Sequence, residues 1–239
     1  MFNKRLGGAL AALLMLASAD AWAGVTAERT RLVLTEGQRE ASLALVNQNA
    51  YPVIVQTWID DGALDAEPDT AEAPFMPLPA VFRLEAGQQR SVRVLATGQA
   101  LPDDHESLFW LNLYEIPPQD KAELAEGQAR LTVTLRTQMK VIYRPKALEA
   151  DAERAPERLR FTWAGDRVQV DNPTPYCITL AGVSVRHGTA LTPLPGETLA
   201  PFSQHRFAVQ APRLARGDQV AYQWLDDGGN TQAATSRLR

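Results

Sequence analysis

Apolar and polar side chains alternate along short segments of the chain from Val25 onward, and clusters of Gly, Pro, Asn and Asp separate these segments. A period of two is typical of β-strands with one buried face. No helical periodicity separates the segments. The pattern predicts strands near residues 25–35, 40–48, 52–59, 79–84, 89–96, 106–116 and 129–143.

Short strands at even spacing, with turn residues between them, indicate an antiparallel immunoglobulin-like sandwich. The segment "DDGALDAEPDTAEAPFMPLPA" after Ile59 is acidic, rich in Ala and Pro, and without a period, so we expect a surface loop there. The last predicted strand, in "RLTVTLRTQMKVIYRP", carries Leu131, Val133 and Leu135 on one side. What covers that apolar side is the main question that the pattern raises.

A polar interval, "PKALEADAERAPER" after Arg144, is the best candidate for a linker, with a short helical turn because Ala, Leu and Glu dominate it. Strand-like segments resume beyond it in "RLRFTW", "DRVQVDN", "YCITLAGVSV", "TLAPFSQHRFAV" and "DQVAYQWLDD". We therefore expect an all-β fold of two immunoglobulin-like β-sandwich domains, at residues 24–145 and 146–239, the second being smaller.

The amino terminus has the pattern of a cleavable signal peptide over residues 1–23. Lys4 and Arg5 precede the short apolar run "LGGALAALLMLA", and "SADAWA" offers a small-residue cleavage site after Ala23. Removal of this segment leaves 22 basic and 27 acidic side chains, so no basic field invites nucleic acid. No later segment has the apolar length of a membrane helix.

Catalytic and metal-binding signatures are missing from the sequence. We find no nucleophile elbow, phosphate-binding loop, His-Glu-x-x-His or Cys-x-x-Cys motif, so we expect no enzyme, nucleotide or cofactor. The histidines lie far apart, which argues against a metal site: they are His105, His187 and His205. Three Asp pairs, at 60–61, 103–104 and 226–227, lie beside Gly or Pro and are interpreted as turn formers. The single cysteine, Cys177, excludes an internal disulfide and is interpreted as a small buried hydrophobe.

Five segments closely resemble the PapD-like periplasmic chaperones of pilus assembly: "ERTRLVL", "RLEAGQQRSVRV", "LPDDHESLFWLNLYEIPP", "MKVIYRP" and "NPTPYCITL". The resemblance covers nearly all of the chain after residue 23. It implies two domains set at an angle with a cleft between them, and a periplasmic protein that lends a strand to incomplete pilus subunits and delivers them to an outer-membrane usher. Departures are His105 and the ending "AATSRLR", which lacks the cysteine pair of some relatives.

The resemblance also implies roles for individual residues. Arg31 and Lys140, with Thr30 beside them, would anchor the carboxyl terminus of the subunit, although isolated Arg and Lys are usually solvated charges. The apolar side chains at 131, 133 and 135 would enter the groove of the subunit as a donor strand, whereas alternation alone fits a strand that covers its own core. A charge network between the domains would comprise Arg93, Glu106 and Asp226, with Asp227 as an alternative to Asp226.

The segment "QDKAELAEGQA", before the last predicted strand, resembles the short loop of one chaperone subclass, associated with rod-like pili. The exposed apolar strand also makes weak self-association of the free chaperone an expected risk. The rival function from a different class is a secreted immunoglobulin-like adhesive or structural surface subunit. Such a subunit would have an amino-terminal donor extension and an incomplete fold, and neither feature is evident in the sequence.

Overall fold

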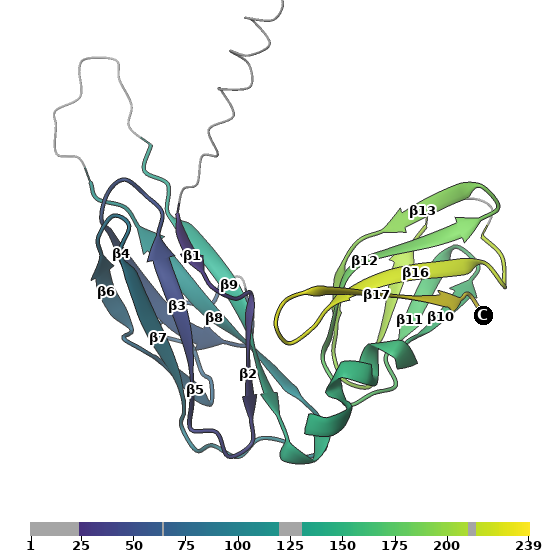
Figure 1. The fold of residues 1–239 in the computed structure, drawn as a ribbon, viewed down its shortest axis with the longest axis horizontal. Helices are drawn as coiled ribbons and strands as arrows, with labels where there is room; N and C mark the ends of the chain where they lie inside the picture. Colours follow the sequence, from purple (N-terminus) through teal and green to yellow (C-terminus); the bar gives the residue numbers. More distant parts are fainter. Residues whose placement is uncertain (1–23, 64, 120–130, 210–213) are drawn as a thin grey trace, which may run out of the picture.

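The computed structural model describes residues 24–63, 65–119, 131–209 and 214–239. Two β-sandwiches lie at an angle, and a short helix joins them at the base (Figure 1). This arrangement confirms the predicted all-β class with two immunoglobulin-like domains. The predicted signal peptide lies outside the described residues. No helix in the described ranges is long and apolar enough to span a membrane.

Two sheets build the amino-terminal domain. The first has the order β1 (Val25–Ala27), β3 (Glu40–Asn47), β7 (Gln89–Ala96) and β5 (Phe75–Leu78). The second has the order β2 (Arg31–Thr35), β9 (Leu135–Arg144), β8 (Ser107–Ile116), β4 (Val53–Asp60) and β6 (Val81–Leu84). Inward-facing side chains from both sheets form one core, which includes Leu34, Leu43, Leu45, Val55, Leu84, Val92, Val94, Leu111 and Val141.

Three expectations for this domain need correction. The predicted strand 25–35 is two strands, because the exposed residues 28–30 carry the chain from β1, which pairs with β3, to β2, which pairs with β9. The predicted loop ends in a strand, β5, since Phe75 and Pro77 are buried against the core. The predicted strand 129–143 is shorter, because β9 begins at Leu135 and residues 131–134 are not in a strand, while 129 and 130 lie outside the described residues.

The carboxyl-terminal domain also has two sheets. One has the order β10 (Arg160–Ala164), β11 (Arg167–Asp171) and β15 (Gln204–Ala208). The other has the order β13 (Ala190–Leu194), β12 (Ile178–His187), β16 (Gln219–Leu225) and β17 (Thr231–Arg237), with β14 (Glu197–Leu199) also paired to β12. Sequence patterning missed β13 and β17. Both lie at sheet edges and expose most of their side chains, so they lack apolar alternation.

The expected linker is the 3₁₀ helix η1 (Lys146–Arg158). Its buried residues are Ala155 and Pro156, and Leu148 packs against the core of the carboxyl-terminal domain. Two tyrosine hydroxyls of that domain donate hydrogen bonds to helix carbonyls, Tyr176 to Leu148 O at 2.7 Å and Tyr222 to Pro156 O at 3.1 Å. The helix is therefore fixed to the second domain rather than hanging free between the two.

Candidate functional site

Arg31 and Lys140 lie side by side on the first domain where it faces the second. They are direct partners in the parallel pairing of β2 with β9. Arg31 is only 4% exposed, its Nη1 donates to Leu225 O at 3.2 Å, and its Nε has no hydrogen-bond partner among the described residues. The Lys140 ammonium donates to Thr179 Oγ1 at 3.0 Å and lies 5.3 Å from the centre of the Trp110 ring. Among the residues that the structure describes, neither of these two adjacent cations forms an ion pair with a carboxylate.

Burial dominates the electrostatics of this pair. It lowers the pKa of the Arg31 guanidinium, and the nearby carboxylates of Asp227 and Asp226 oppose the shift. Burial, together with the positive charge of Arg31, lowers the pKa of Lys140 to about 8. Two like charges held together out of water favour an incoming anion, because it relieves both the repulsion and the lost hydration. The pair is chemically suited to bind a carboxylate.

The open edge of β9 ends at this pair. The partner β2 covers only residues 140–144 of β9, whereas residues 135–139 are paired on the β8 side alone in the part of the chain that the structure describes. The chain enters β2 from the other sheet, so this stretch of β9 keeps unpaired backbone groups. A strand added there in parallel would end where Arg31 begins, with its carboxylate between the two cations.

The predicted donor side chains are exposed beside this edge. Leu131 is 86% exposed, Val133 58% and Leu135 49%. Met139 and Val141, further along the same strand, are buried in the domain core. The core of the domain therefore does not cover the apolar side at 131–135, and the alternative that these side chains fill it is not supported by their exposure.

A polar cluster that the sequence did not reveal holds the start of β9 to the sheet. Arg136 donates from Nε to Asn112 Oδ1 at 2.8 Å and from Nη2 to Asp60 Oδ2 at 3.1 Å. Its guanidinium also lies 4.9 Å from the centre of the Trp58 ring, and the indole Nε1 donates to the same Asp60 oxygen at 3.0 Å. Asp60 is buried and binds several donors, so the turn-forming role expected for it is only part of its function.

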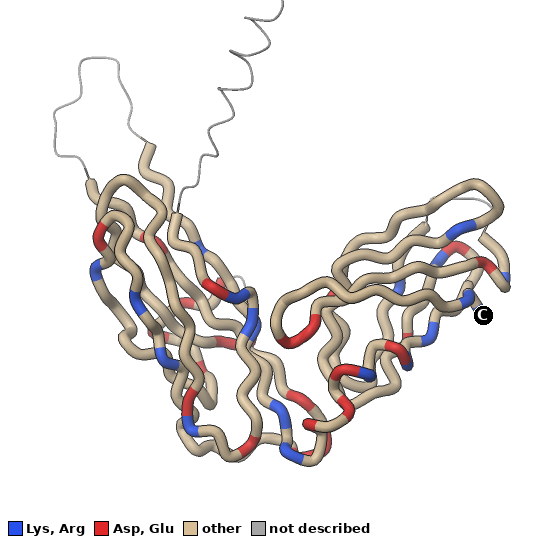
Figure 2. The backbone as a smooth tube through the Cα atoms, viewed as in Figure 1, with Lys and Arg blue, Asp and Glu red and all other residues tan. Residues whose placement is uncertain are grey.

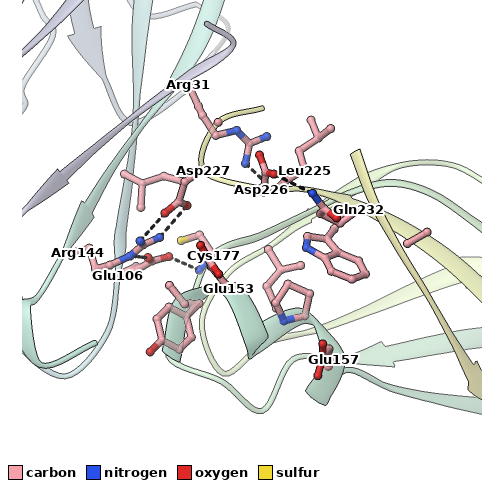
Figure 3. Close-up of a pocket in the computed structure, with 18 residues that line it drawn as sticks. Arg31, Glu106, Arg144, Glu153, Glu157, Cys177, Leu225, Asp226, Asp227 and Gln232 are labelled. Atoms are coloured by element: carbon pink, nitrogen blue, oxygen red, sulfur yellow. Dashed lines mark hydrogen bonds and ion pairs between the residues drawn. The ribbon is translucent and has the colours of Figure 1, made fainter. Parts of the chain in front are cut away.

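Arg144 joins the two domains. Its Nε donates to Glu106 Oε1 at 2.5 Å, and its two terminal nitrogens donate to Asp227 at 2.6 and 2.9 Å (Figure 3). Glu106 in turn accepts the backbone N–H of Cys177 at 2.7 Å. Burial alone would lower the pKa of Arg144, but the bonds to Asp227 and Glu106 outweigh it and raise that pKa. The network holds the β16–β17 hairpin close to Arg31, whose guanidinium donates to Leu225 O.

Two members of the predicted interdomain network are elsewhere. Arg93 pairs with Glu40 on the outer face of the first sheet, and its neighbours Val92 and Val94 point inward, so it cannot reach the second domain. Asp226 closes the β16–β17 turn by accepting hydrogen bonds from Asn230 and Gln232. Asp227, the alternative residue, takes its place in the network. Sequence reasoning assigned no role to Arg144, because its partners come from distant parts of the chain.

Thr30 lies against Gly229 in the turn of the β16–β17 hairpin. A Cβ on Gly229 would lie 2.7 Å from Thr30 Oγ1, which shows how closely the hairpin approaches the first domain. Figure 2 shows acidic residues at the hairpin tip opposite basic residues at the start of β2. The hairpin therefore lies against the anchor region, and its glycine allows that approach.

A cavity of about 490 Å³ lies between the domains beside Arg31. Its lining includes Arg31, Arg144, Cys177 and Trp224. Burial raises the pKa of the Cys177 thiol to about 12, so the thiol stays protonated and favours the inert interpretation. The described parts of the chain contain no group of three or more His, Cys, Asp or Glu residues able to hold a metal ion.

The structure thus combines two sandwiches at an angle, an open strand edge beside exposed apolar side chains, and two adjacent cations at the end of that edge. Comparison with known proteins gives the class. Residues 24–149 match the family described as "Pili and flagellar-assembly chaperone, PapD N-terminal domain", and residues 154–236 match "Pili assembly chaperone PapD, C-terminal domain". The chain belongs to the PapD-like family of pilus-assembly chaperones.

Individual relatives agree along nearly the whole length. The probable fimbrial chaperone YadV of Escherichia coli K12 is 30% identical, with 99% of each chain covered. The chaperone protein FimB/FhaD of Bordetella pertussis is 34% identical, with 95% of this chain and 94% of the relative covered. The solved structure of the SafB chaperone with SafA pilin of Salmonella enterica matches with a TM-score of 0.77 and 28% identity, covering 92% of this chain and 99% of that one.

Proposed function

We propose that this protein is a periplasmic chaperone that binds pilus subunits by donor-strand complementation and delivers them to an outer-membrane usher. Leu131, Val133 and Leu135 enter the groove of an incomplete subunit, while the last strand of the subunit pairs with the open edge of β9. Arg31 and Lys140 bind the terminal carboxylate of the subunit, and Thr30 lines the approach. The role is non-catalytic, since folding and strand exchange of the subunit supply the free energy of assembly.

One observation carries the proposal: the open edge of β9 ends where the buried Arg31 meets the partly buried Lys140. Anchor and edge therefore act on the same added strand. The carboxylate fixes the register of that strand, and the register decides which apolar side chains enter the groove. The family relationship supports pilus subunits as the partners, and it favours a chaperone over the alternative of a surface adhesin. Delivery to an usher and periplasmic location rest on the family and on the predicted signal peptide.

The test is co-purification from the periplasm of cells that express the pilus genes. Tagged wild-type protein is compared with Arg31→Ala and Lys140→Ala, and mass spectrometry identifies any small subunit that accompanies it. Arg93→Ala is the matched control, because Arg93 is an exposed arginine on the same domain, paired with Glu40. We expect a stoichiometric pilin-like partner that both anchor variants lose and the control retains. A chain that purifies alone in every case would overturn the proposal.

A further inference from the structure

Glu115, at the end of β8, is a buried carboxylate without a cation. It is 7% exposed, and its oxygens accept the backbone N–H of Val25 at 2.7 Å and the side-chain amide of Asn49 at 2.7 Å. It forms no ion pair with a Lys, Arg or His side chain in the described ranges. Buried carboxylates are seldom left without a positive partner, because lost hydration of the charge is costly. A positively charged group would therefore complete the hydrogen bonding and the charge balance of this site.

Gly24 is the residue next to this carboxylate. It is buried, its N–H donates to Asn49 Oδ1 at 3.0 Å, and its carbonyl accepts the N–H of Gln48 at 3.0 Å. Its φ of +102° suits glycine, and a Cβ built there would lie 3.5 Å from Glu115 Oε2. The first described residue of the chain is thus held at both its nitrogen and its carbonyl, within reach of the buried carboxylate.

The sequence predicts cleavage of the chain between Ala23 and Gly24. Cleavage turns the Gly24 nitrogen from an amide into an ammonium group, with a positive charge and additional donors. We propose that Asn49 and Glu115 form a binding site for the α-ammonium group of Gly24, so that removal of the signal peptide completes the amino-terminal domain. The inference rests on this predicted processing, which belongs to the proposed function, and not on capture of a subunit.

The site also contacts the donor strand. Glu115 is the pairing partner of Leu135 across β8 and β9, and a Cβ on Gly24 would lie 3.7 Å from Leu135 Cδ1. The bound terminus packs against the first residue of β9, where the strand begins and the exposed donor segment ends. Processing therefore adds the charge of the ammonium group, and its bond to Glu115, beside the position from which the donor side chains project.

The test compares two forms of the full mature chain, one beginning at Gly24 and one that retains Ala23 in front of it. The second form displaces the ammonium by one residue and keeps every described side chain. Glu115→Gln is introduced into both, and thermal unfolding is measured at pH 7. We expect Glu115→Gln to lower Tm by about 6–20 °C more in the Gly24 form than in the Ala23 form, as for loss of a buried ion pair in a chain of this size.

The matched control is Glu28→Gln, because the exposed Glu28 carboxylate also accepts a backbone N–H, from Ala44 at 3.2 Å. Its effect should be small and equal in both forms. An equal loss of Tm for Glu115→Gln in the two forms would overturn the proposal, since Glu115 would then act only through Val25 and Asn49.

A second measurement does not depend on folding of the Glu115 variant. Acetylation of Gly24 in the otherwise unchanged mature chain removes the charge and keeps one N–H donor for Asn49. We expect the acetylated chain to unfold several degrees below the free-amine chain, and equal Tm values would contradict the ammonium site. Because neither readout involves a subunit, failure here leaves the proposed chaperone function standing, and failure of subunit capture leaves this inference standing.

Discussion

The two ends of β9 follow one alternating pattern in the sequence but differ in their surroundings. At the carboxyl end, Met139 and Val141 are buried and β2 pairs with the strand on the side away from β8. At the amino end, Leu135 is half exposed, and Leu131 and Val133 precede the strand with larger exposed fractions. Edge pairing also differs, since β2 begins at Arg31 and leaves the edge of residues 135–139 open, but Met139 in that open stretch is buried by the domain core. Alternation thus identifies an apolar side, and packing against the domain core decides how much of that side the protein itself covers.

The boundary between the two ends is also where the charges gather. Lys140 is the first residue of β9 that β2 pairs with, and Arg31 is its partner. Both donate hydrogen bonds to the second domain, to Thr179 Oγ1 and Leu225 O respectively. In the proposed function, a bound strand would contact two places of different chemistry. Apolar burial would act along the open end, and charge neutralisation would act at the covered end. Each can be altered without the other, which allows the following tests.

The largest effect is expected from the open end. Combined Leu131→Ser, Val133→Ser and Leu135→Ser removes about 5–9 kcal/mol of gross burial in the complex. After ordering costs, subunit affinity should fall by at least about 10³-fold. Tm of the free chaperone should hardly change, because these side chains are exposed in it. Affinity is measured by titration with a refolding subunit, and Tm by calorimetry.

Leu191→Ser serves as the control for that triple variant, because Leu191 is an exposed leucine of the second domain with 55% of its surface accessible. It should affect neither quantity. A fall in Tm of the free triple variant would show that the three side chains belong to the core of the domain, which is the simpler interpretation of their alternation.

The next effect concerns the network above the covered end. Arg144→Ala leaves Glu106 buried, at 2% exposure, without its positive partner. Loss of one member of a buried pair costs about 3–5 kcal/mol, so the midpoint of urea unfolding should fall sharply. Arg93→Ala removes an exposed ion pair with Glu40, which contributes about 0–1 kcal/mol to the free energy of unfolding. Similar midpoints for the two variants would refute the assignment of Arg144 as the link between the domains.

Much of the fold could be predicted from the sequence where burial is one-sided. Strands such as β7 and β16 bury alternate residues over much of their length, so their apolar period of two is visible in the chain. The edge strand β17 exposes nearly all its side chains, and "TQAATSR" therefore carries no such signal. The segment of β5 was hidden by the acidic, Pro-rich stretch before it. Only its pairing with β7 makes it a strand.

The sequence predicted those site residues that can be recognised one at a time. Arg31, Lys140 and the three apolar side chains follow from the family resemblance, and the structure brings the two cations together and leaves the apolar side chains exposed. The charge network was not predictable residue by residue. Glu106 and Arg144 come from the first domain and Asp227 from a hairpin of the second, and nothing in the local sequence distinguishes Asp227 from Asp226. Such a choice is decided by the geometry of the turn.

A smaller effect should follow from the pKa of Lys140, which burial and Arg31 lower to about 8 in the free protein. A bound carboxylate raises that pKa, so the contribution of Lys140 to affinity is complete below pH 8 and is lost as pH rises above it. Subunit affinity should fall about tenfold between pH 7 and pH 9. Isothermal titration at several pH values measures this, and Lys140→Arg, which stays charged, should flatten the profile.

The stability of the free chaperone should change in the opposite direction over the same range. The folded pKa of about 8 lies below the unfolded value of 10.5, so the folded state binds fewer protons between them and gains stability as pH rises. In Lys140→Arg this gain should disappear. An affinity that is constant from pH 7 to pH 9 in the wild type would mean that Lys140 does not touch the bound carboxylate.

The smallest effect tests how closely the hairpin of the second domain approaches the anchor pair. Gly229 has φ of +84°, and a Cβ there would meet Thr30 Oγ1 at 2.7 Å. Gly37 has a similar φ of +88° with nothing within 4 Å of such a Cβ. Both Gly→Ala changes should cost about 1 kcal/mol for the left-handed backbone. Only Gly229→Ala should cost more, and Thr30→Ala should recover that excess in a double-mutant cycle of urea unfolding. If Gly37→Ala is as costly as Gly229→Ala, the hairpin is free to move away from β2, and the geometry of the anchor end is not set by this contact.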